Sequence, residues 1–240
     1  MPRFFTSDIA GDTARITGAD AHHIGRVLRM RIGEELTVCD TRGWDYTGPI
    51  SSITPQEVTV TIERRQPTTS EPTLSVTLYQ GLPKSDKLEW IIQKAVELGV
   101  TRVVPVVTAR SIAKADADKA DKKRERWQRI AAEAAGQSGR GIIPAVEAPL
   151  SWKHMIKELS PSQTLVFYEG GGKPLSERID PSHTQLAILI GPEGGFSPEE
   201  IDELTAMGVT PATLGKRILR CETAPIAALS AIMTLSGNME

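Results

Sequence analysis

The chain has 240 residues, of which 40% are hydrophobic and 24% charged, a composition typical of a globular protein with one large core or two small ones. Its formal net charge of -2 excludes an overall basic nucleic-acid-binding domain, so any RNA contact must come from local patches. No apolar run is long enough to span a bilayer and the N-terminus lacks a signal-peptide core, so we expect no membrane contact and a cytoplasmic location.

The cysteines and histidines predict neither a disulfide framework nor a metal site. Cys39 and Cys221 are far apart in the sequence, whereas metal ligands usually occur as closely spaced pairs. His22 and His23 are adjacent, and the other two histidines stand alone. We therefore expect no bound metal.

Residues 1–70 contain short β-rich stretches separated by turn residues, a pattern that predicts a small β-barrel or sandwich. The expected strands are 14–17, 35–39, 46–50 and 57–62. The polar, proline-flanked run 66–73 has no periodicity and is interpreted as an interdomain linker.

A basic segment lies between the first two of these strands. Ile24, Val27 and Leu28 can share an apolar helical face, which leaves Arg26 and Arg29 on another face. These arginines can clamp phosphates. The alternative is that they solvate a short helix, and the residues alone favour this alternative.

From residue 74 onward, strands alternate with longer helices, which predicts an α/β domain with a mostly parallel sheet. The strands are expected at 74–79, 102–107, 164–168 and 186–190, and the helices at 84–98, 117–137, 152–158 and 225–235. Ligands of such sheets bind at the carboxyl ends of the strands.

Two glycine loops occupy this position in the pattern. The apolar run 186–190 is typical of a strand buried on both faces, and it ends at GPEGG, residues 191–195. Ser197, Pro198 and Glu200 then predict the capped start of a helix. The second loop, LGKRILRCET at 214–223, precedes an alanine-rich helix. Loops at adjacent strand ends would form a ligand site.

Common ligand and nucleophile motifs do not match these loops. Thr210 and Arg217 stand where a P-loop needs glycine and a hydroxyl residue, and GPEGG is not the dinucleotide fingerprint. The segment 136–139 lacks the spacing of a nucleophile elbow, and the glycine triplet 170–172 is interpreted as a flexible connection. A glycine loop with apolar borders suits a flat, largely uncharged ring such as adenine.

The two loops together resemble the SPOUT superfamily of methyltransferases, and within it most closely the RsmE family of 16S ribosomal RNA uridine-N3 methyltransferases. The segments that carry the resemblance are 189–196, 214–224, 84–99, 125–140 and 22–31, so it extends over nearly the whole chain. It implies a PUA-like RNA-binding β-barrel at 1–70. It also implies a SPOUT methyltransferase domain at 71–240, an α/β fold whose parallel sheet ends in a C-terminal trefoil knot.

The same resemblance implies S-adenosylmethionine as methyl donor, a homodimer through the knotted domain, and the small ribosomal subunit as partner. The implied cofactor contacts are Ile190, Gly191, Gly195, Leu214, Gly215, Ile218 and Leu219. RNA contact becomes the preferred interpretation of Arg26 and Arg29. Arg140 is expected to contact RNA or a partner subunit, and Lys216 and Arg217 are expected to contact phosphate.

Methylation of uridine N3 requires loss of the imide proton, so the site needs a base or a group that stabilises the uracil anion. Arg220 is the first candidate for that stabilisation. Glu222 or Glu193 would accept the proton if desolvation raises its pKa. The alternatives are that Glu193 caps backbone amides of its loop and that Glu222 pairs with Arg220.

The expected function is therefore methylation of 16S ribosomal RNA, with the assembled small subunit as the preferred substrate. Fold similarity does not choose the RNA. A SPOUT methyltransferase acting on another RNA, such as transfer RNA, and a noncatalytic ribosome assembly factor are the alternatives.

Overall fold

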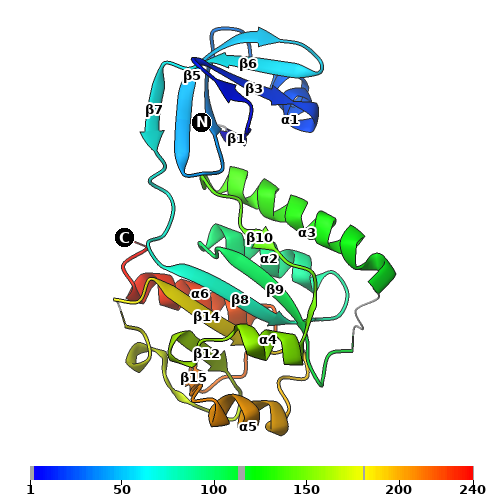
Figure 1. The fold of residues 1–240 in the computed structure, drawn as a ribbon, viewed down its shortest axis with the longest axis vertical. Helices are drawn as coiled ribbons and strands as arrows, with labels where there is room; N and C mark the ends of the chain where they lie inside the picture. The colour runs from blue at the N-terminus through cyan, green and yellow to red at the C-terminus, as the bar shows by residue number, and fades with distance from the viewer. Residues whose placement is uncertain (1–2, 113–116, 181, 240) are drawn as a thin grey trace. The chain divides into compact units, whose positions relative to one another are not determined.

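The computed structural model describes residues 3–112, 117–180 and 182–239. The chain divides into two compact units (Figure 1), of which the first comprises Met1–Glu71 and Ala135–Ile143 and the second Pro72–Ala134 and Pro144–Glu240. The helix α3 (Ala117–Gln137) has the bounds expected from the sequence, and its last residues belong to the first unit.

The first unit is a mainly antiparallel sheet with the strand order β1-β4-β5-β6-β3-β2, and β7 pairs with β5. The strands are β1 (Arg3–Phe5), β2 (Ile9–Ala10), β3 (Thr13–Thr17), β4 (Glu35–Cys39), β5 (Trp44–Ile53), β6 (Glu57–Thr61) and β7 (Arg64–Pro67). Alternate residues of β3 and β6, among them Ile16 and Val58, are buried in one core. All four expected strands are confirmed. The expected linker is shorter, because Gln66 and Pro67 pair with β5.

The basic segment folds as α1 (Gly18–His22) followed by a π-helical turn, η1 (His23–Val27). Ile24 is fully buried, whereas Val27 is 59% exposed and Leu28 40% exposed. The expected shared apolar face is therefore wrong, because a π-helical turn does not keep the side-chain spacing of an α-helix. Arg26 and Arg29 are both exposed.

Arg140 corrects one expectation about RNA contact. Its side chain is 3% exposed, and its Nη2 lies 2.6 Å from Glu71 Oε2. Glu71 Oε1 also accepts hydrogen bonds from the backbone N–H groups of Gly141 at 2.9 Å and Ile142 at 3.2 Å. A buried charged group loses its hydration, and an opposite charge with hydrogen bonds must compensate for that loss. Arg140 is thus a structural residue that fastens the segment 135–143 to Glu71, and its expected contact with RNA or a partner subunit is wrong.

We expect Glu71→Ala to destabilise the protein by about 3 kcal/mol, because it leaves the buried Arg140 guanidinium without its carboxylate. Urea unfolding followed by circular dichroism measures this change. The matched variant Glu63→Ala removes an exposed glutamate of the same unit and should change the midpoint little. Equal midpoints for the two variants would contradict the structural role of the pair.

The second unit is a parallel sheet with the order β10-β9-β8-β14-β12-β15-β13, and β11 pairs with β9. The strands are β8 (Ser75–Gly81), β9 (Arg102–Val107), β10 (Ala145–Val146), β11 (Leu150–Ser151), β12 (Thr164–Phe167), β13 (Lys173–Pro174), β14 (Gln185–Ile190) and β15 (Pro211–Thr213). The four expected strands and the parallel sheet are confirmed. The unexpected strands have only two or three residues, too few for a readable pattern.

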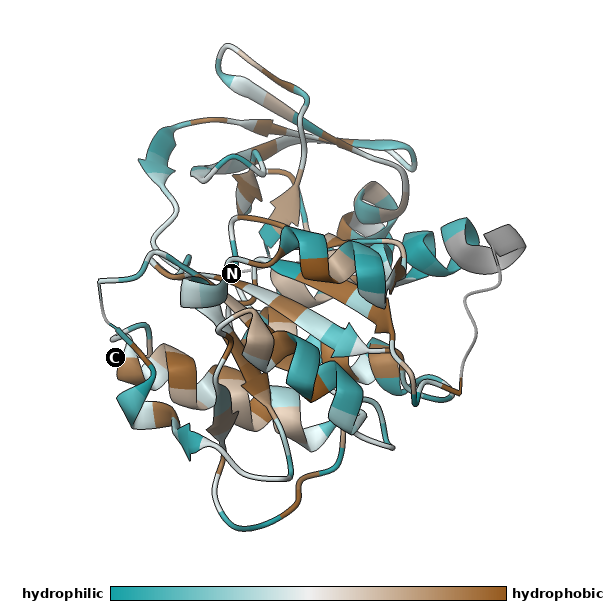
Figure 2. Ribbon diagram, turned by 60° about the horizontal axis from the view of Figure 1, so that its bottom comes forward, coloured by the Kyte–Doolittle hydropathy of each residue, from teal (hydrophilic) through white to brown (hydrophobic). Residues whose placement is uncertain are grey.

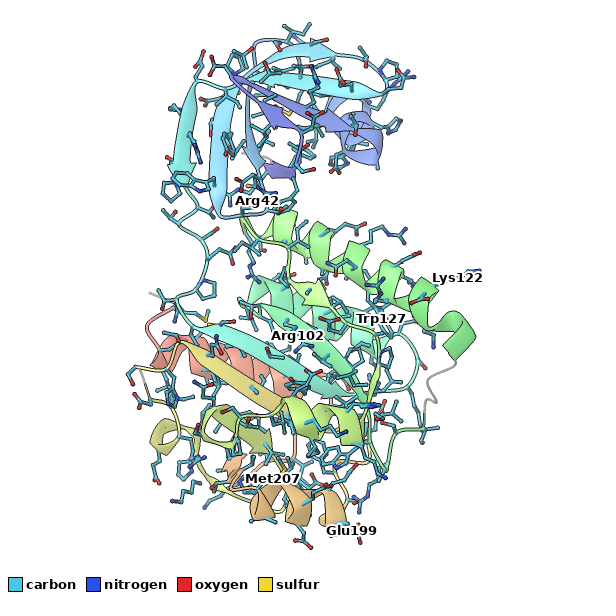
Figure 3. All side chains as sticks on the ribbon, viewed as in Figure 1. Arg42, Arg102, Lys122, Trp127, Glu199 and Met207 are labelled. Carbon is cyan, nitrogen blue, oxygen red and sulfur yellow. The ribbon has the colours of Figure 1, made fainter. Side chains whose placement is uncertain are left out.

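The remaining helices are α2 (Lys87–Glu97), α4 (Trp152–Glu158), α5 (Pro198–Ala206) and α6 (Thr223–Leu235). On α3, Trp127 is buried and faces the sheet, whereas Lys122 is exposed on the other side (Figure 3). The helix α6 is mainly apolar, as its brown colour shows in Figure 2. Within the described part of the chain, no helix combines the length and the apolar character needed to cross a membrane.

The expected cap of α5 is confirmed, and its Glu200 carboxylate also binds the backbone of another loop. Ser197 Oγ accepts a hydrogen bond from the Glu200 N–H at 3.3 Å, and Glu200 Oε2 accepts one from the Ser197 N–H at 2.9 Å. Glu200 Oε1 also accepts one from the Ala109 N–H at 2.8 Å. The buried carboxylate therefore joins the loop after β9 to the chain that follows the 191–195 loop.

Candidate functional site

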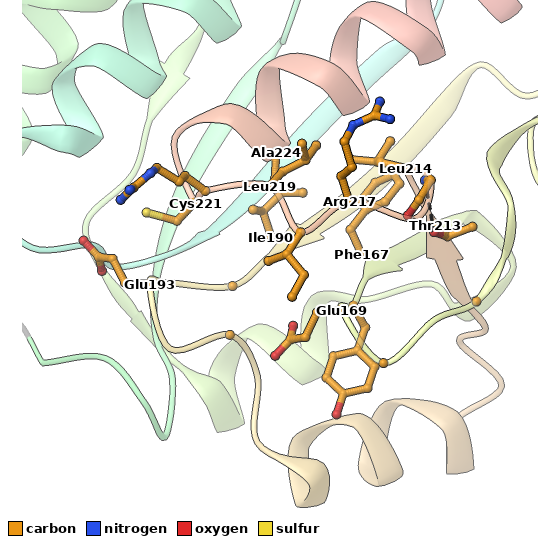
Figure 4. A pocket seen from close by; sticks show the side chains of 18 of the residues that line it. Phe167, Glu169, Ile190, Glu193, Thr213, Leu214, Arg217, Leu219, Cys221 and Ala224 are labelled. Carbon is orange, nitrogen blue, oxygen red and sulfur yellow. Dashed lines mark hydrogen bonds between the residues drawn. The ribbon is translucent and has the colours of Figure 1, made fainter.

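Three loops meet at one edge of the parallel sheet. β12 lies between β14 and β15 and is parallel to both, so the carboxyl ends of the three strands are adjacent. The loops that follow them, 168–172, 191–195 and 214–222, line a cavity of about 800 Å³ (Figure 4). This volume is within the usual range for a small-molecule site.

The cavity brings together most of the residues expected from the sequence. The lining includes the seven expected cofactor contacts, the three catalytic candidates and two expected phosphate contacts: Ile190, Gly191, Gly195, Leu214, Gly215, Ile218, Leu219, Arg220, Glu222, Glu193, Lys216 and Arg217. Arg26 and Arg29 belong to the first unit and do not line it.

The 191–195 loop has little room for side chains. Gly195 has φ +67°, and a Cβ atom there would lie 2.4 Å from Glu169 Oε1. A Cβ atom on Gly191 would lie 3.0 Å from the Gly195 backbone. The fully buried Gln80 donates from Nε2 to the Gly191 carbonyl oxygen at 3.2 Å. Glycine thus lets the loop turn tightly and expose backbone groups to the cavity.

The glycine triplet 170–172 was not expected to form part of the site, and that interpretation is wrong. All three glycines line the cavity, together with Phe167 and Glu169. A Cβ atom on Gly172 would lie 2.4 Å from the Pro211 carbonyl oxygen, so only glycine fits against the start of β15. The signal was present in the sequence, because the triplet follows the expected strand 164–168 as the 191–195 loop follows the expected strand 186–190.

Lys87, at the start of α2, forms the charged end of the cavity. Its Nζ lies 3.1 Å from Glu193 Oε1 and 3.3 Å from Glu222 Oε2. In Figure 4, Glu193 and Cys221 lie at one end of the lining, and Thr213 and Leu214 lie at the other. No sequence pattern links Lys87 to this site, because it lies 106 positions before Glu193 and 135 positions before Glu222.

The two glutamates do not have the raised pKa on which their expected role as a base depended. Burial raises the pKa of Glu193, but hydrogen bonds from its own backbone N–H, from Lys87 and from the Lys84 N–H outweigh burial and lower it. The Cys221 thiol, the Glu222 N–H and Lys87 likewise lower the pKa of Glu222 against the effect of burial. Both carboxylates are therefore ionised at neutral pH.

The structure also decides between the alternative contacts. Glu193 accepts from its own backbone N–H within the loop, as in the capping alternative, and also from the Lys84 N–H outside the loop, at 3.2 Å to Oε1 and 3.4 Å to Oε2. Glu222 pairs with Lys87 and not with Arg220. Arg220 is exposed, and its side chain has no hydrogen-bond or ion-pair partner in the described part of the chain. Its guanidinium is available for a ligand.

Lys216 and Arg217 are exposed on the loop that closes the cavity. Across the described ranges, no group of three or more His, Cys, Asp or Glu side chains could hold a metal ion. The chemistry offered by the described site is therefore exposed backbone, apolar contacts, paired carboxylates and free cations.

Comparisons with known proteins agree with this architecture. The RNA methyltransferase domain family matches residues 69–233, and the RNA methyltransferase PUA domain family matches residues 16–63. The ribosomal RNA small subunit methyltransferase E of Bacillus subtilis (strain 168) is 39% identical over an alignment of 228 positions, which covers 92% of this chain and 89% of the relative. The chain belongs to the ribosomal RNA small subunit methyltransferase E family.

Solved structures of related proteins share the whole fold. A methyltransferase E structure from Neisseria gonorrhoeae, bound to S-adenosyl methionine, has a TM-score of 0.90 and 32% identity and covers 98% of each chain. A putative methyltransferase from Legionella pneumophila with bound cofactor SAM has a TM-score of 0.88 and 32% identity, over 97% of this chain and 96% of that one. The α/β sheet and the PUA domain are thus features of the methyltransferase E family.

We expect both thiols of this methyltransferase E family member to be unreactive in the native state. Burial, a hydrogen bond to Glu222 and the charge of Glu193 raise the pKa of Cys221 to about 12. Burial and a hydrogen bond to Asp45 raise the pKa of Cys39 well above its usual value. At pH 8 the thiolate fraction of Cys221 is then about one in ten thousand.

Ellman's reagent at pH 8 measures this reactivity. The native protein should react far more slowly than the same protein unfolded in urea, in which both thiols return to an ordinary pKa. A thiol of the native protein that reacts at the unfolded rate would contradict the buried, hydrogen-bonded state of Cys39 or Cys221.

Proposed function

We propose that the chain transfers a methyl group from S-adenosylmethionine to N3 of a specific uridine in 16S ribosomal RNA, with the assembled small subunit as substrate. The observation that carries the proposal is one cavity in which three glycine-containing loops adjoin a free arginine and paired carboxylates. Membership of the ribosomal RNA methyltransferase E family supports the class of reaction and of RNA.

The residues of the cavity fit S-adenosylmethionine. Ile190, Leu214 and Leu219 provide apolar contacts beside exposed backbone, which suit an adenine ring. The relatives from Neisseria gonorrhoeae and Legionella pneumophila hold this cofactor in the same fold. The cofactor supplies an electrophilic methyl group on a sulfonium. The remaining proposed contacts of this chain are Gly191, Gly195, Gly215 and Ile218.

Three side chains carry the proposed chemistry. Arg220 stabilises the negative charge that develops on the uracil ring as N3 loses its proton. Glu222, or Glu193 as second candidate, accepts that proton as a weak base, because its pKa is lowered, so the proton transfer depends on Arg220 stabilising the anion that forms. Holding N3 in line with the methyl group supplies much of the remaining reduction in the barrier.

RNA binding is divided between two sets of exposed cations. Arg26 and Arg29 bind RNA backbone through the PUA domain, and Lys216 and Arg217 bind phosphate beside the cavity. The target uridine must be splayed out of structured RNA before its N3 edge can enter the site. Positive charge confined to these patches is compatible with the net charge of -2.

We also propose that the protein acts in the cytoplasm as a homodimer and that its C-terminal segment forms a trefoil knot. The SPOUT resemblance supports the location, the homodimer and the knot. The apolar surface of the C-terminal part of the chain also supports the homodimer. Ile218 is 83% exposed and Leu235 is 43% exposed, as expected of residues that a second copy can cover.

We expect Arg220→Ala to lower kcat/KM for methyl transfer by about 10² to 10³, the usual effect of removing one group that stabilises a developing anion. The measurement uses labelled S-adenosylmethionine, small ribosomal subunits from cells that lack the protein, and mass spectrometry of the digested nucleosides. The wild type should produce 3-methyluridine. Binding of subunits should change much less than turnover.

Absence of incorporation by wild-type protein that binds the cofactor would contradict the assignment to 16S ribosomal RNA. The same assay with transfer RNA tests the nearest alternative substrate. No methyl transfer to either RNA, together with intact subunit binding, is the result expected of a noncatalytic assembly factor.

We expect Arg26→Ala with Arg29→Ala to weaken RNA binding and to reduce the slope of log K against log salt concentration by about two, one for each lost phosphate contact. Binding titrations at several salt concentrations measure the slope. Cofactor affinity should be unchanged, because neither arginine lines the cavity. Arg42→Ala, an exposed arginine of the same unit, is the control. Loss of cofactor affinity in the double variant would contradict this division between the two units.

A further inference from the structure

Lys87 connects three segments that are distant in sequence. It begins α2, and its ammonium group reaches Glu193 in the loop after β14 and Glu222 in the last loop. Its Nζ also lies 4.0 Å from Cys221 Sγ. All four residues line the cavity, so Lys87 is a candidate for a role in the reaction itself.

We propose that Lys87 is a positioning residue for methyl transfer, which holds Glu222 so that its Oε1 accepts the N3 proton of the uridine. The inference rests on the proposed function. It gives a role to Lys87, and it selects Glu222 rather than Glu193 as the proton acceptor.

The contacts of the two glutamates differ in the way this assignment requires. Both oxygens of Glu193 receive the Lys84 N–H, and Oε1 also receives Lys87. The Glu222 contacts with Cys221 Sγ, at 3.1 Å, and with Lys87 Nζ, at 3.3 Å, are both made to Oε2. Oε1 of Glu222 takes part in neither of these two side-chain contacts, and the carboxylate also receives the Glu222 N–H, so the group is held while Oε1 stays clear of Cys221 and Lys87.

The cation between the carboxylates has an electrostatic consequence. Two nearby carboxylates disfavour each other's ionised form, and a shared ammonium group offsets this repulsion. The groups that face Glu222 are the Cys221 thiol, its own backbone N–H and Lys87, whereas Glu193 acts on Cys221 and shares Lys87 with Glu222. Cys221 stays neutral because its pKa is raised to about 12, so the carboxyl groups are the ones that titrate in the acidic range.

The proposed step balances in atoms and charge. Glu222 takes the N3 proton, the N3 electron pair forms the bond to the methyl carbon, and the bond between that carbon and sulfur breaks with its electrons on sulfur. The products are 3-methyluridine, neutral S-adenosylhomocysteine and a protonated Glu222, which then releases its proton to water. Lys87 stays protonated throughout, in accord with a pKa raised by its bond to Glu193.

The test is the pH dependence of kcat/KM for wild type, Lys87→Met and Lys87→Arg. In the wild type, Glu222 remains ionised below the usual range of a glutamate, so the acidic limb of the profile lies at low pH. Loss of Lys87 removes one of the contacts that lower the pKa of Glu222, so the limb should move to higher pH. Loss of the held carboxylate geometry should separately lower kcat/KM at neutral pH by at least tenfold. Lys87→Arg should restore the wild-type limb.

The matched control is Lys94→Met, which removes another ion-paired lysine of α2, the partner of Glu97. Its profile should equal that of the wild type, and isothermal titration should give the same cofactor affinity for every variant within about twofold. A uniform loss of rate in Lys87→Met, with no movement of the acidic limb, would overturn the positioning role. An unchanged rate would overturn it as well.

The experiment gives different results if the proposed function is wrong and if only the role of Lys87 is wrong. If the wild type forms no 3-methyluridine, the proposed function falls and this inference falls with it. If the wild type is active and the Lys87→Met profile is unaltered, only the role of Lys87 is wrong.

Discussion

The parallel pairing of β12 with both β14 and β15 is the constraint on which the site depends. Parallel neighbours end at the same edge of a sheet, so this pairing makes three loops that are distant in sequence converge. The glycines then let backbone approach backbone, at Gly195 beside Glu169 and at Gly172 beside Pro211. A side chain at either glycine would fill the space that a ligand needs or displace a neighbouring strand.

Electrostatics give that cavity two different ends. Lys87 pairs with both Glu193 and Glu222, whereas the Arg220 side chain is without a partner in the described residues. In a reaction that removes a proton from a ring, a carboxylate can accept the proton and a free guanidinium can stabilise the negative charge left on the ring. The glycine loops and apolar side chains of the remaining lining suit the cofactor, and Glu169, Lys216 and Arg217 are the charged residues among them.

Arg140 shows how a charged residue can mislead sequence analysis. An arginine after a glycine-containing segment suggested an exposed contact, yet its side chain is buried against Glu71, which is 69 positions away. Val27 and Leu28 mislead in the opposite direction, since apolar spacing predicted burial and a π-helical turn exposes them. A local sequence pattern gives the periodicity of a helix or strand, but it does not show which distant residues pack against that element.

The sequence by itself determined the longer strands and helices of both units, the cap of α5 and the two glycine loops at 191–195 and 214–223. These features depend on interactions between residues close in the chain, which leave a readable pattern. Only the tertiary structure decided that the glycine triplet belongs to the site, that Lys87 links Glu193 to Glu222, and that the carboxyl pKa values fall. Those outcomes depend on contacts between distant segments and on the balance of burial against hydrogen bonds, which no sequence spacing records.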